Sequence, residues 1–540
     1  MLLGIDFGTT RTRVAVESQG SYSLVEFRAK DGFDQDWYPS LIAARRDEAL
    51  FGLEARAVQY DADWELCRSF KRLLNDGHPQ SVLRIGGIDQ TLLEWFTQYL
   101  RTLREHLLHD SSLEVEAGEP LRVIAGVPTN ANSNQRFLTL EGFRRAGFEV
   151  LGMLNEPSAA GIEFSHHYQS SRRSHRNKHL VVYDLGGGTF DVSVIRMTGL
   201  QHDVVGSEGI ARLGGDDFDE LLLELALDQP TVDPLVRKNL RLAAGGILIP
   251  PFSAGVRSRM LNLCREAKES IGPATRRISV DFSQLGIVSD LALVPIDRFY
   301  EKCQSVIAST IEATESALNR AFGNSEPGQD DAAHVYLVGG SCDLPVLARA
   351  LKQRFGKRVR RSPYPAGATA TGLVLAGAKE SGIEIKEQFS RFFGVWREND
   401  SGAQLAFDPI FAKNTVLPGL GDRPLVVTRR YRPMHNIGHL RFLECSRLAE
   451  TGQPQGDIIS WDEVYFPYDP ALIENTALHL VPVERWPGAQ SHCVEETYRC
   501  DAQGIIEVTI VNATAGYSRQ YRVRQTRGEV AKRKTAHVGS

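Results

Sequence analysis

Two stretches of the sequence place an aspartate beside a turn of small residues. The first, LLGIDFGTTRTRVAV, runs from Leu2 to Val16, and the second, VVYDLGGGTFDVSVI, runs from Val181 to Ile195. Because glycine has no Cβ, such turns let backbone N–H groups approach phosphate oxygens, and the aspartate can hold Mg²⁺ through its waters. Two turns of this kind predict a clamp that grips a triphosphate from both sides.

Hydrophobic patterning predicts the elements that position these turns. Short apolar runs bounded by glycine predict buried strands at four places, Leu2–Gly8, Leu121–Asn130, His179–Ile195 and His334–Pro345. Between them, Ser133–Phe148 and Asp297–Phe322 have the apolar periodicity of amphipathic helices, and Ser133 is the predicted N-cap of the first. Strand and helix patterns alternate through residue 380, which is typical of an α/β fold.

Charge and composition exclude several classes of protein. The net charge of −5 over 540 residues indicates no general attraction to nucleic acids or membrane surfaces, so neither is an expected partner. Seven cysteines without a CxxC pair predict reduced thiols rather than a disulfide framework or a zinc site. The sequence has no secretory leader pattern and no long apolar run, so a cytoplasmic monomer is expected.

The patterns of apolar, charged and turn-forming residues divide the chain into four parts. An α/β domain is predicted over residues 1–380, a charged linker over 381–400, a β-rich domain over 401–525, and a basic tail without regular structure over 526–540. Within the third part, short β-type runs around a turn at Gln503–Gly504 predict a small β-sandwich. The basic stretch SSRRSHRNKH, residues 170–179, is predicted to be a solvated loop.

Further segments add to the two Asp/Gly/Thr stretches. Together they resemble the phosphate-binding and neighbouring segments of the actin-like ATPase superfamily, most closely the DnaK-type heat-shock protein 70 chaperone family. In order along the chain, the similar segments are SFKRLL (Ser69–Leu74), GVPTNANSNQR (Gly126–Arg136), LNEPSAAGIEF (Leu154–Phe164), LGGDDFDELL (Leu213–Leu222) and VYLVGGSCDLPVLARAL (Val335–Leu351). AKNTVLP (Ala412–Pro418) and CDAQGIIEVTI (Cys500–Ile510) resemble parts of that family's substrate-binding β-sandwich.

The resemblance implies an α/β actin-like, ribonuclease H-like, two-lobed ATPase domain followed by a smaller β-sandwich domain. It also implies slow ATP hydrolysis, with ATP/ADP and Mg²⁺ as cofactors. By this resemblance, Asp6 and Asp184 would hold Mg²⁺ through water, and Lys71 would reach the γ-phosphate and the attacking water. Glu156 and Asp191 would orient that water or the metal shell, and Thr189 would touch the γ-phosphate.

The same resemblance implies a larger set of nucleotide-binding residues. They are Gly8, Thr9, Thr10, Arg11, Gly186, Gly187, Gly188, Gly214, Gly215, Asp216, Lys268, Gly339, Gly340 and Ser341. Arg11 replaces an aromatic or small residue of the family, and it would either contact phosphate or point to solvent.

The sequence departs from the family pattern on the adenine side. Arg265 stands where a glutamate is usual, Asp343 where an arginine stacks on the base, and Ala366 where an aspartate is usual. Glu269 and Gly272 also replace a basic residue and a serine. The resemblance therefore predicts phosphate binding and leaves the selectivity for adenine open.

The expected function is that of an ATP-hydrolysing, DnaK-like chaperone. Its β-domain would bind unfolded or partner protein segments, with co-chaperones or a nucleotide-exchange factor as further partners. An atypical linker, IEIKEQFSRFFGV, and the expected absence of a helical lid favour an alternative, a nucleotide-switched scaffold with one dedicated partner. An actin-fold sugar or acetate kinase is a third alternative, against which Lys71 and the LGGDDFD segment count.

Overall fold

The computed structural model describes residues 1–28, 32, 34–116, 118–168, 178–229, 254–285, 291–323, 334–378, 381–399, 404–419, 421–461, 463–522 and 530–532. The chain divides into two units. Unit 1 comprises Met1–Asn130 and Leu138–Ile385, and unit 2 comprises Ala131–Phe137 and Lys386–Ser540. Within the described residues, every helix is too short or too polar to cross a membrane.

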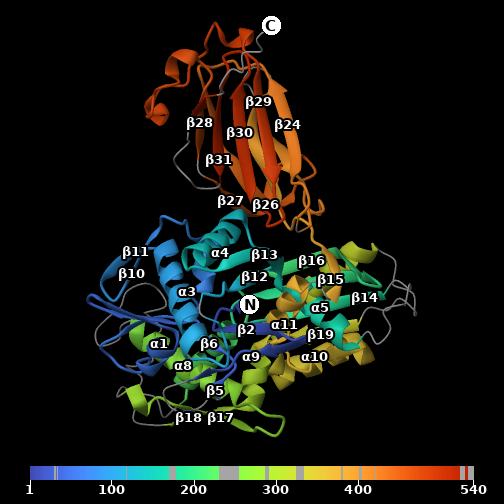
Figure 1. The fold of residues 1–540 in the computed structure, drawn as a ribbon. Coiled ribbons are helices and arrows are strands. Elements are labelled where there is room, and N and C mark those ends of the chain that lie inside the picture. The colour runs from blue at the N-terminus through green and yellow to red at the C-terminus, as the bar shows by residue number, and fades with distance from the viewer. Residues whose placement is uncertain are drawn as a thin grey trace. The chain divides into compact units, whose positions relative to one another are not determined.

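Unit 1 contains two mixed sheets whose strands follow one repeated order (Figure 1). The first has the order β13-β12-β1-β2-β3, with β6 beside β2, and the second has the order β20-β19-β14-β15-β16-β21. In each sheet three successive strands form antiparallel hairpins, and two later strands join them in parallel. The turn after β1 and the turn after β14 therefore occupy equivalent places in the two sheets.

The strands of the first sheet are β1 (Leu2–Phe7), β2 (Arg11–Ser18), β3 (Ser21–Leu24), β6 (Tyr38–Pro39), β12 (Arg122–Val127) and β13 (Glu149–Asn155). Those of the second are β14 (Lys178–Leu185), β15 (Phe190–Thr198), β16 (Gln201–Ile210), β19 (His334–Val338), β20 (Val359–Arg361) and β21 (Glu384–Lys386). Smaller sheets are made by β4 (Phe27–Arg28) with β5 (Asp34–Gln35), β7 (Ile42–Arg45) with β8 (Glu48–Phe51) and β9 (Glu65–Cys67), β10 (Val82–Ile85) with β11 (Ile88–Thr91), and β17 (Arg277–Asp281) with β18 (Leu291–Pro295).

Helices alternate with these strands, as the α/β pattern predicts. They are α1 (Gly52–Ala57), α2 (Lys71–Asp76), α3 (Leu92–His109), α4 (Ser133–Arg145), α5 (Glu156–Tyr168), α6 (Gly215–Leu227), α8 (Ala254–Glu269), α9 (Ile296–Phe322), α10 (Pro345–Phe355) and α11 (Ala368–Gly377). The helix predicted from Ser133 is α4, but the prediction that Ser133 is its N-cap is wrong. Ser133 is the first helical residue, and the side chain of Asn132 accepts a hydrogen bond from the Gln135 N–H at 2.8 Å.

Close backbone packing fixes the elements that end at the site. A Cβ on Gly4 of β1 would lie 2.3 Å from the carbonyl oxygen of Ala370 in α11. A Cβ on Gly372 of α11 would lie 1.8 Å from the carbonyl oxygen of Ala159 in α5. Glycine at both positions therefore lets α11 lie directly against β1 and α5. These two elements carry Asp6 and Glu156.

Unit 2 is built from antiparallel strands. One sheet has the order β23-β22-β26-β27 and another the order β24-β29-β30-β31-β32, with β25 and β28 as a separate pair. Side chains of both larger sheets share one buried core, which includes Phe393 and Val395 from the first and Val494, Tyr498 and Val508 from the second. Buried and more exposed residues alternate along β30, as expected of a strand with one face toward the core.

The strands of unit 2 are β22 (Phe392–Asn399), β23 (Gln404–Phe411), β24 (Leu425–Tyr431), β25 (Ile437–Leu440), β26 (Phe442–Leu448), β27 (Pro454–Ser460), β28 (Val464–Pro467), β29 (Val494–Cys500), β30 (Ile506–Asn512), β31 (Tyr517–Arg522) and β32 (Val530–Lys532). The turn predicted at Gln503–Gly504 joins β29 to β30, and Gly504 has a φ of 75°, which glycine tolerates.

The linker and the tail differ from the sequence-based expectation. The predicted linker contains β21, which is an edge strand beside β16, and β22, whose Phe393 and Val395 are buried in the core of unit 2. Apolar alternation in RFFGVWREN, read as part of a charged bridge, is the signal for β22. In the predicted irregular tail, β32 pairs with the free edge of β31. Of the predicted basic loop, residues 170–177 lie outside the described residues, and 178–179 begin β14.

Candidate functional site

The two Gly/Thr turns of unit 1 touch each other. A Cβ on Gly187 would lie 2.7 Å from Thr10 Cγ2, and a Cβ on Gly188 would lie 2.5 Å from Thr9 Oγ1. Both distances are shorter than any real Cβ contact, so side chains at these two positions would push the turns apart. The absence of side chains at Gly187 and Gly188, which is predicted to let phosphate approach, thus also lets the opposite turn approach.

The turns lie at a cavity of about 370 Å³, a size within the range of small-ligand sites. Most of the residues that the sequence predicts for nucleotide binding and catalysis line it. They are Asp6, Gly8, Thr9, Thr10, Arg11, Lys71, Glu156, Asp184, Gly186, Gly187, Thr189, Gly215, Asp216, Lys268, Gly339, Gly340 and Ser341. The cavity therefore gathers segments that are more than 300 positions apart in the sequence.

Three predicted site residues lie behind the lining. A Cβ on Gly214 would lie 2.7 Å from the Gly187 carbonyl carbon, so Gly214 supports the second turn from outside. Gly188 faces Thr9. Asp191 is 3% exposed and accepts a hydrogen bond from the Thr129 N–H at 2.9 Å. Asp191 acts on the cavity through its charge, because it stabilises the protonated form of Lys71.

Buried carboxylates crowd the inner end of the cavity. Burial, followed by repulsion from Glu156, raises the pKa of Asp6 to about 7 and that of Asp191 to about 7. Burial, then the charges of Glu156, Asp6 and Asp191, hold the pKa of Asp184 well above its ordinary range. These carboxyl groups are therefore forced together without enough positive charge among the residues around them.

Lys71 supplies one balancing charge. Its Nζ donates to Glu156 Oε1 at 2.5 Å, and both side chains are more than nine-tenths buried. Burial alone would lower the pKa of Lys71, but the attraction of Glu156 and Asp6 outweighs burial and raises it. Lys71 is therefore protonated and held at one place by Glu156.

This set of oxygen donors fits Mg²⁺, which prefers carboxylates and retains several of its waters. A divalent cation would relieve the repulsion that raises the pKa values of Asp6 and Asp184. Within the described residues no three His, Cys, Asp or Glu side chains converge closely enough to ligate a metal directly. Asp6 and Asp184 are the two carboxylates that the sequence analysis assigns to this ion.

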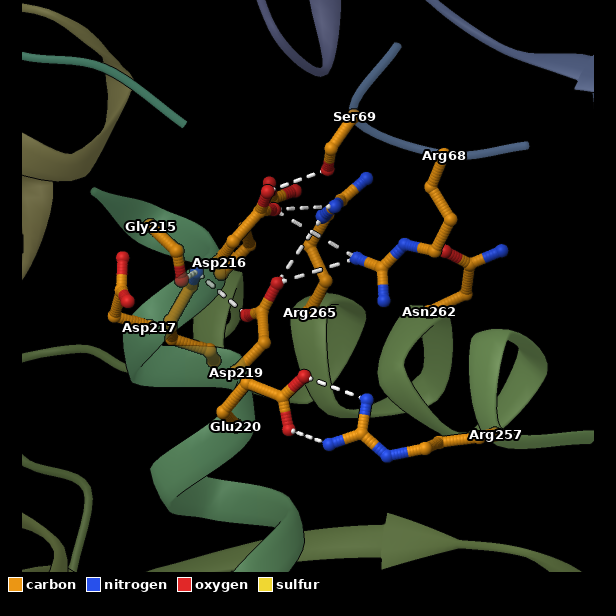
Figure 2. A network of polar contacts seen from close by, with 12 residues as sticks. Arg68, Ser69, Gly215, Asp216, Asp217, Asp219, Glu220, Arg257, Asn262 and Arg265 are labelled. Atoms are coloured by element: carbon orange, nitrogen blue, oxygen red, sulfur yellow. Dashed lines mark hydrogen bonds and ion pairs between the residues drawn. The ribbon is translucent and has the colours of Figure 1, made fainter. Parts of the chain in front are cut away.

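A polar network ties the segment of Lys71 to α6 and α8 (Figure 2). Ser69, two residues before Lys71, has a left-handed φ of 54°, and its hydroxyl donates to Asp216 in α6. Arg265 in α8 donates to the other oxygen of Asp216 at 2.9 Å. Arg68 forms an ion pair of 3.4 Å with Asp219, also in α6. The strained backbone at Ser69 is thus retained by two contacts to α6, and Arg265 of α8 in turn holds Asp216.

The same segment is tied to the second turn. Arg72, next to Lys71, donates from Nε to the Gly188 carbonyl oxygen at 3.1 Å and from Nη2 to Asp217 at 3.0 Å. Lys71 is therefore positioned relative to both turns: through Glu156 on the side of β1, and through its neighbour Arg72 on the side of β14.

Residues that depart from the family pattern have partners within this chain. Arg11 lines the cavity and forms an ion pair of 2.5 Å with Glu269, and its guanidinium lies 4.4 Å from the centre of the Trp37 ring. Asp343 pairs with Arg361 at the exposed rim. Arg11 therefore neither points away to solvent nor stands free, and Glu269 is its counter-ion in place of a basic residue.

The cavity also has lining residues that the sequence analysis did not name. They include Arg13, Phe218, Ile271, Tyr364, Pro365 and Thr369. Arg13 had a sequence signal, because on a strand the side chains of residues 11 and 13 lie on the same face. Tyr364 had none, since only the return of the chain after β20 brings it to the cavity.

One comparison with known proteins identifies a family. The model of the family described as "Hsp70 protein" matches residues 110–390, which is more than half of the chain. The matched range contains Glu156, Asp184 and the second turn. The first turn and Lys71 precede it.

The pH dependence of unit 1 tests the carboxylate cluster. The pKa of Asp6 is about 7 in the folded chain, against 3.8 ordinarily, so its contribution to stability is full at low pH and is lost as pH rises through 7. We expect Asp6→Asn to raise the free energy of unfolding of nucleotide-free unit 1 by about 2 kcal/mol at pH 8, and by less at pH 5. Urea unfolding at both pH values measures this difference.

The control is Asp47→Asn, which removes the same charge from an exposed turn. It should leave the stability unchanged at both pH values. A gain for Asp6→Asn that is equal at pH 5 and pH 8 would show that Asp6 is not raised in pKa.

Proposed function

Because the chain belongs to the Hsp70 family, we propose that it is an ATP-dependent chaperone whose unit 1 hydrolyses ATP and whose unit 2 binds unfolded or partner protein segments. Membership of the family implies an ATP-dependent, chaperone-like function. The observation that carries the proposal is the contact of Thr9 and Thr10 with Gly187 and Gly188 beside the buried Lys71–Glu156 pair. The family match also favours this function over a sugar or acetate kinase.

In this proposal the two turns bind the phosphates. The hydroxyls of Thr9 and Thr10 and the N–H groups of Gly187 and Gly188 donate to phosphate oxygens from opposite sides. The Gly186 N–H donates to the Thr189 carbonyl oxygen at 3.1 Å and so holds the shape of the second turn. Gly339 keeps the second turn open, because its φ of 86° lets it lie where a Cβ would come 2.4 Å from the Leu185 carbonyl oxygen. By resemblance to the family, Gly339–Ser341 and Lys268 receive the adenosine.

Catalysis would depend on charge that is in place before the reaction starts. Phosphoryl transfer has little covalent chemistry for the protein to perform, so positioning and electrostatic stabilisation dominate. Protonated Lys71, held by Glu156, stabilises negative charge as it develops near the γ-phosphate. Asp191, behind the lining, acts through its charge on Lys71, and Thr189 donates to the phosphate. Mg²⁺ held by Asp6 and Asp184 would neutralise phosphate charge.

The route from the cavity toward unit 2 begins at β15 and β16. Asp191 of β15 pairs with Gly209 of β16, and β16 also carries the edge strand β21. Ile383 and Ile385 pack on a buried cluster of unit 1, and the Glu384 N–H donates to the Leu200 carbonyl oxygen at 3.0 Å. We propose that a nucleotide-dependent shift of β15 and β16 alters how firmly β21 is held, and thereby the chain that leads into unit 2.

Removal of Lys71 tests the catalytic assignment. We expect Lys71→Ala to lower kcat for ATP hydrolysis about 100-fold, the usual effect of losing a preorganised charge donor, with a much smaller change in KM. Lys302→Ala, which removes an exposed lysine of α9, should leave both values unchanged. Steady-state phosphate release measures this, and binding of MgADP to Lys71→Ala checks that the variant is folded. A kcat within twofold of the starting protein would remove Lys71 from the mechanism.

Peptide release tests the coupling. With the full chain and a fluorescent unfolded model peptide, ATP should speed peptide dissociation at least tenfold relative to ADP, because closure and opening of a binding site act mostly on dissociation rates. Stopped-flow anisotropy provides the rates. Equal rates with ATP and ADP would contradict the chaperone proposal and leave the nucleotide-switched scaffold with one dedicated partner.

A further inference from the structure

Five cationic side chains line the cavity of unit 1: Arg11, Arg13, Lys71, Arg265 and Lys268. Four of them form ion pairs with carboxylates. Lys71 pairs with Glu156, Arg11 with Glu269, Arg265 with Asp216, and Lys268 with Asp219. In the described part of the chain no carboxylate lies within 4.0 Å of the Arg13 guanidinium. Arg13 is therefore the lining cation whose charge has no ionic partner among those residues.

Arg13 is also buried. Its exposed fraction is 9%, and its Nε has no hydrogen-bond partner in the described structure. Its guanidinium lies over the ring of Tyr364, 6.0 Å from the ring centre. The Tyr364 hydroxyl in turn donates to Asp36. The neutral phenol ring of Tyr364 contacts the guanidinium but supplies no negative charge to balance it.

The position of Arg13 places this charge beside the phosphate-binding elements. Arg13 is the cross-strand partner of Asp6 in the β1–β2 hairpin, and it follows the turn Gly8–Thr10 by three residues. It lowers the pKa of Asp6, although less than burial and Glu156 raise it. Arg13 thus faces the part of the cavity that lies next to a proposed Mg²⁺-holding carboxylate.

A buried guanidinium without an anion is costly, and its planar fork of N–H donors matches the oxygens of a phosphate. We propose that Arg13 binds a phosphate oxygen of the nucleotide, and that this contact makes affinity depend on the phosphates more than on the base. This proposal rests on the proposed function, because it takes the ligand of the cavity to be a nucleoside di- or triphosphate. Arg13 is then a binding residue that determines specificity for the polyphosphate.

The experiment compares three probes: MgADP, Mg²⁺ with inorganic pyrophosphate, and adenosine. Calorimetry with the full chain gives the affinity for each. We expect Arg13→Gln to weaken binding of MgADP and of pyrophosphate by about tenfold or more, as the loss of a charge-assisted contact implies, and to change adenosine binding less than twofold. Arg13→Lys should lose less than Arg13→Gln, because it keeps the charge but not the fork.

Arg122→Gln is the matched control, since it removes the same charge from an exposed position on β12 of the same sheet. It should leave all three affinities unchanged. Unchanged binding of MgADP and pyrophosphate to Arg13→Gln would overturn the proposal, and so would an equal loss for adenosine, which would make Arg13 a packing residue. The proposed function fails separately if the unsubstituted chain binds pyrophosphate through Arg13 but does not hydrolyse ATP.

Discussion

The contact between two hairpin turns is the constraint on which the site depends. Gly187 and Gly188 stand so close to Thr10 and Thr9 that no Cβ fits at either glycine. The two sheets of unit 1 repeat one strand order, which gives each turn the same relation to its own sheet. The tight packing of α11 against β1 and α5 then holds the first turn and Glu156 in place.

The carboxyl groups beside this contact are placed for binding a ligand, at a cost to the stability of the fold. Asp6, Asp184 and Asp191 all have raised pKa values, which means that folding brings these carboxyl groups together at a cost. Lys71 offsets part of that cost through Glu156. The outer network of Asp216 and Asp219 has the opposite character, because arginines surround it and lower the pKa of Asp216 despite its burial. The inner cluster is therefore short of cations, and the outer network has enough of them.

The sequence predicts the inner cluster better than its surroundings, for a physical reason. Asp6, Asp184 and the two turns are local motifs, so their residues are visible together in short stretches. The partners of Arg265 cannot be found this way, since Asp216 lies 49 positions away and only the packing of α6 on α8 brings them together. Arg13 was missed although its alternation with Arg11 was visible. The sequence predicts a linker where β22 lies, because the charged end of this strand masks the alternation of Phe393 and Val395.

We infer that unit 1 binds its ligand only while the two turns touch. The most direct measurement is a calorimetric titration of MgATP into the full chain and into Gly187→Ala, whose new methyl group would lie 2.7 Å from Thr10 Cγ2. We expect one bound nucleotide per unsubstituted chain and at least a tenfold loss of affinity in Gly187→Ala, with the cooperative unfolding of unit 1 retained. Equal affinity in the two proteins would contradict it.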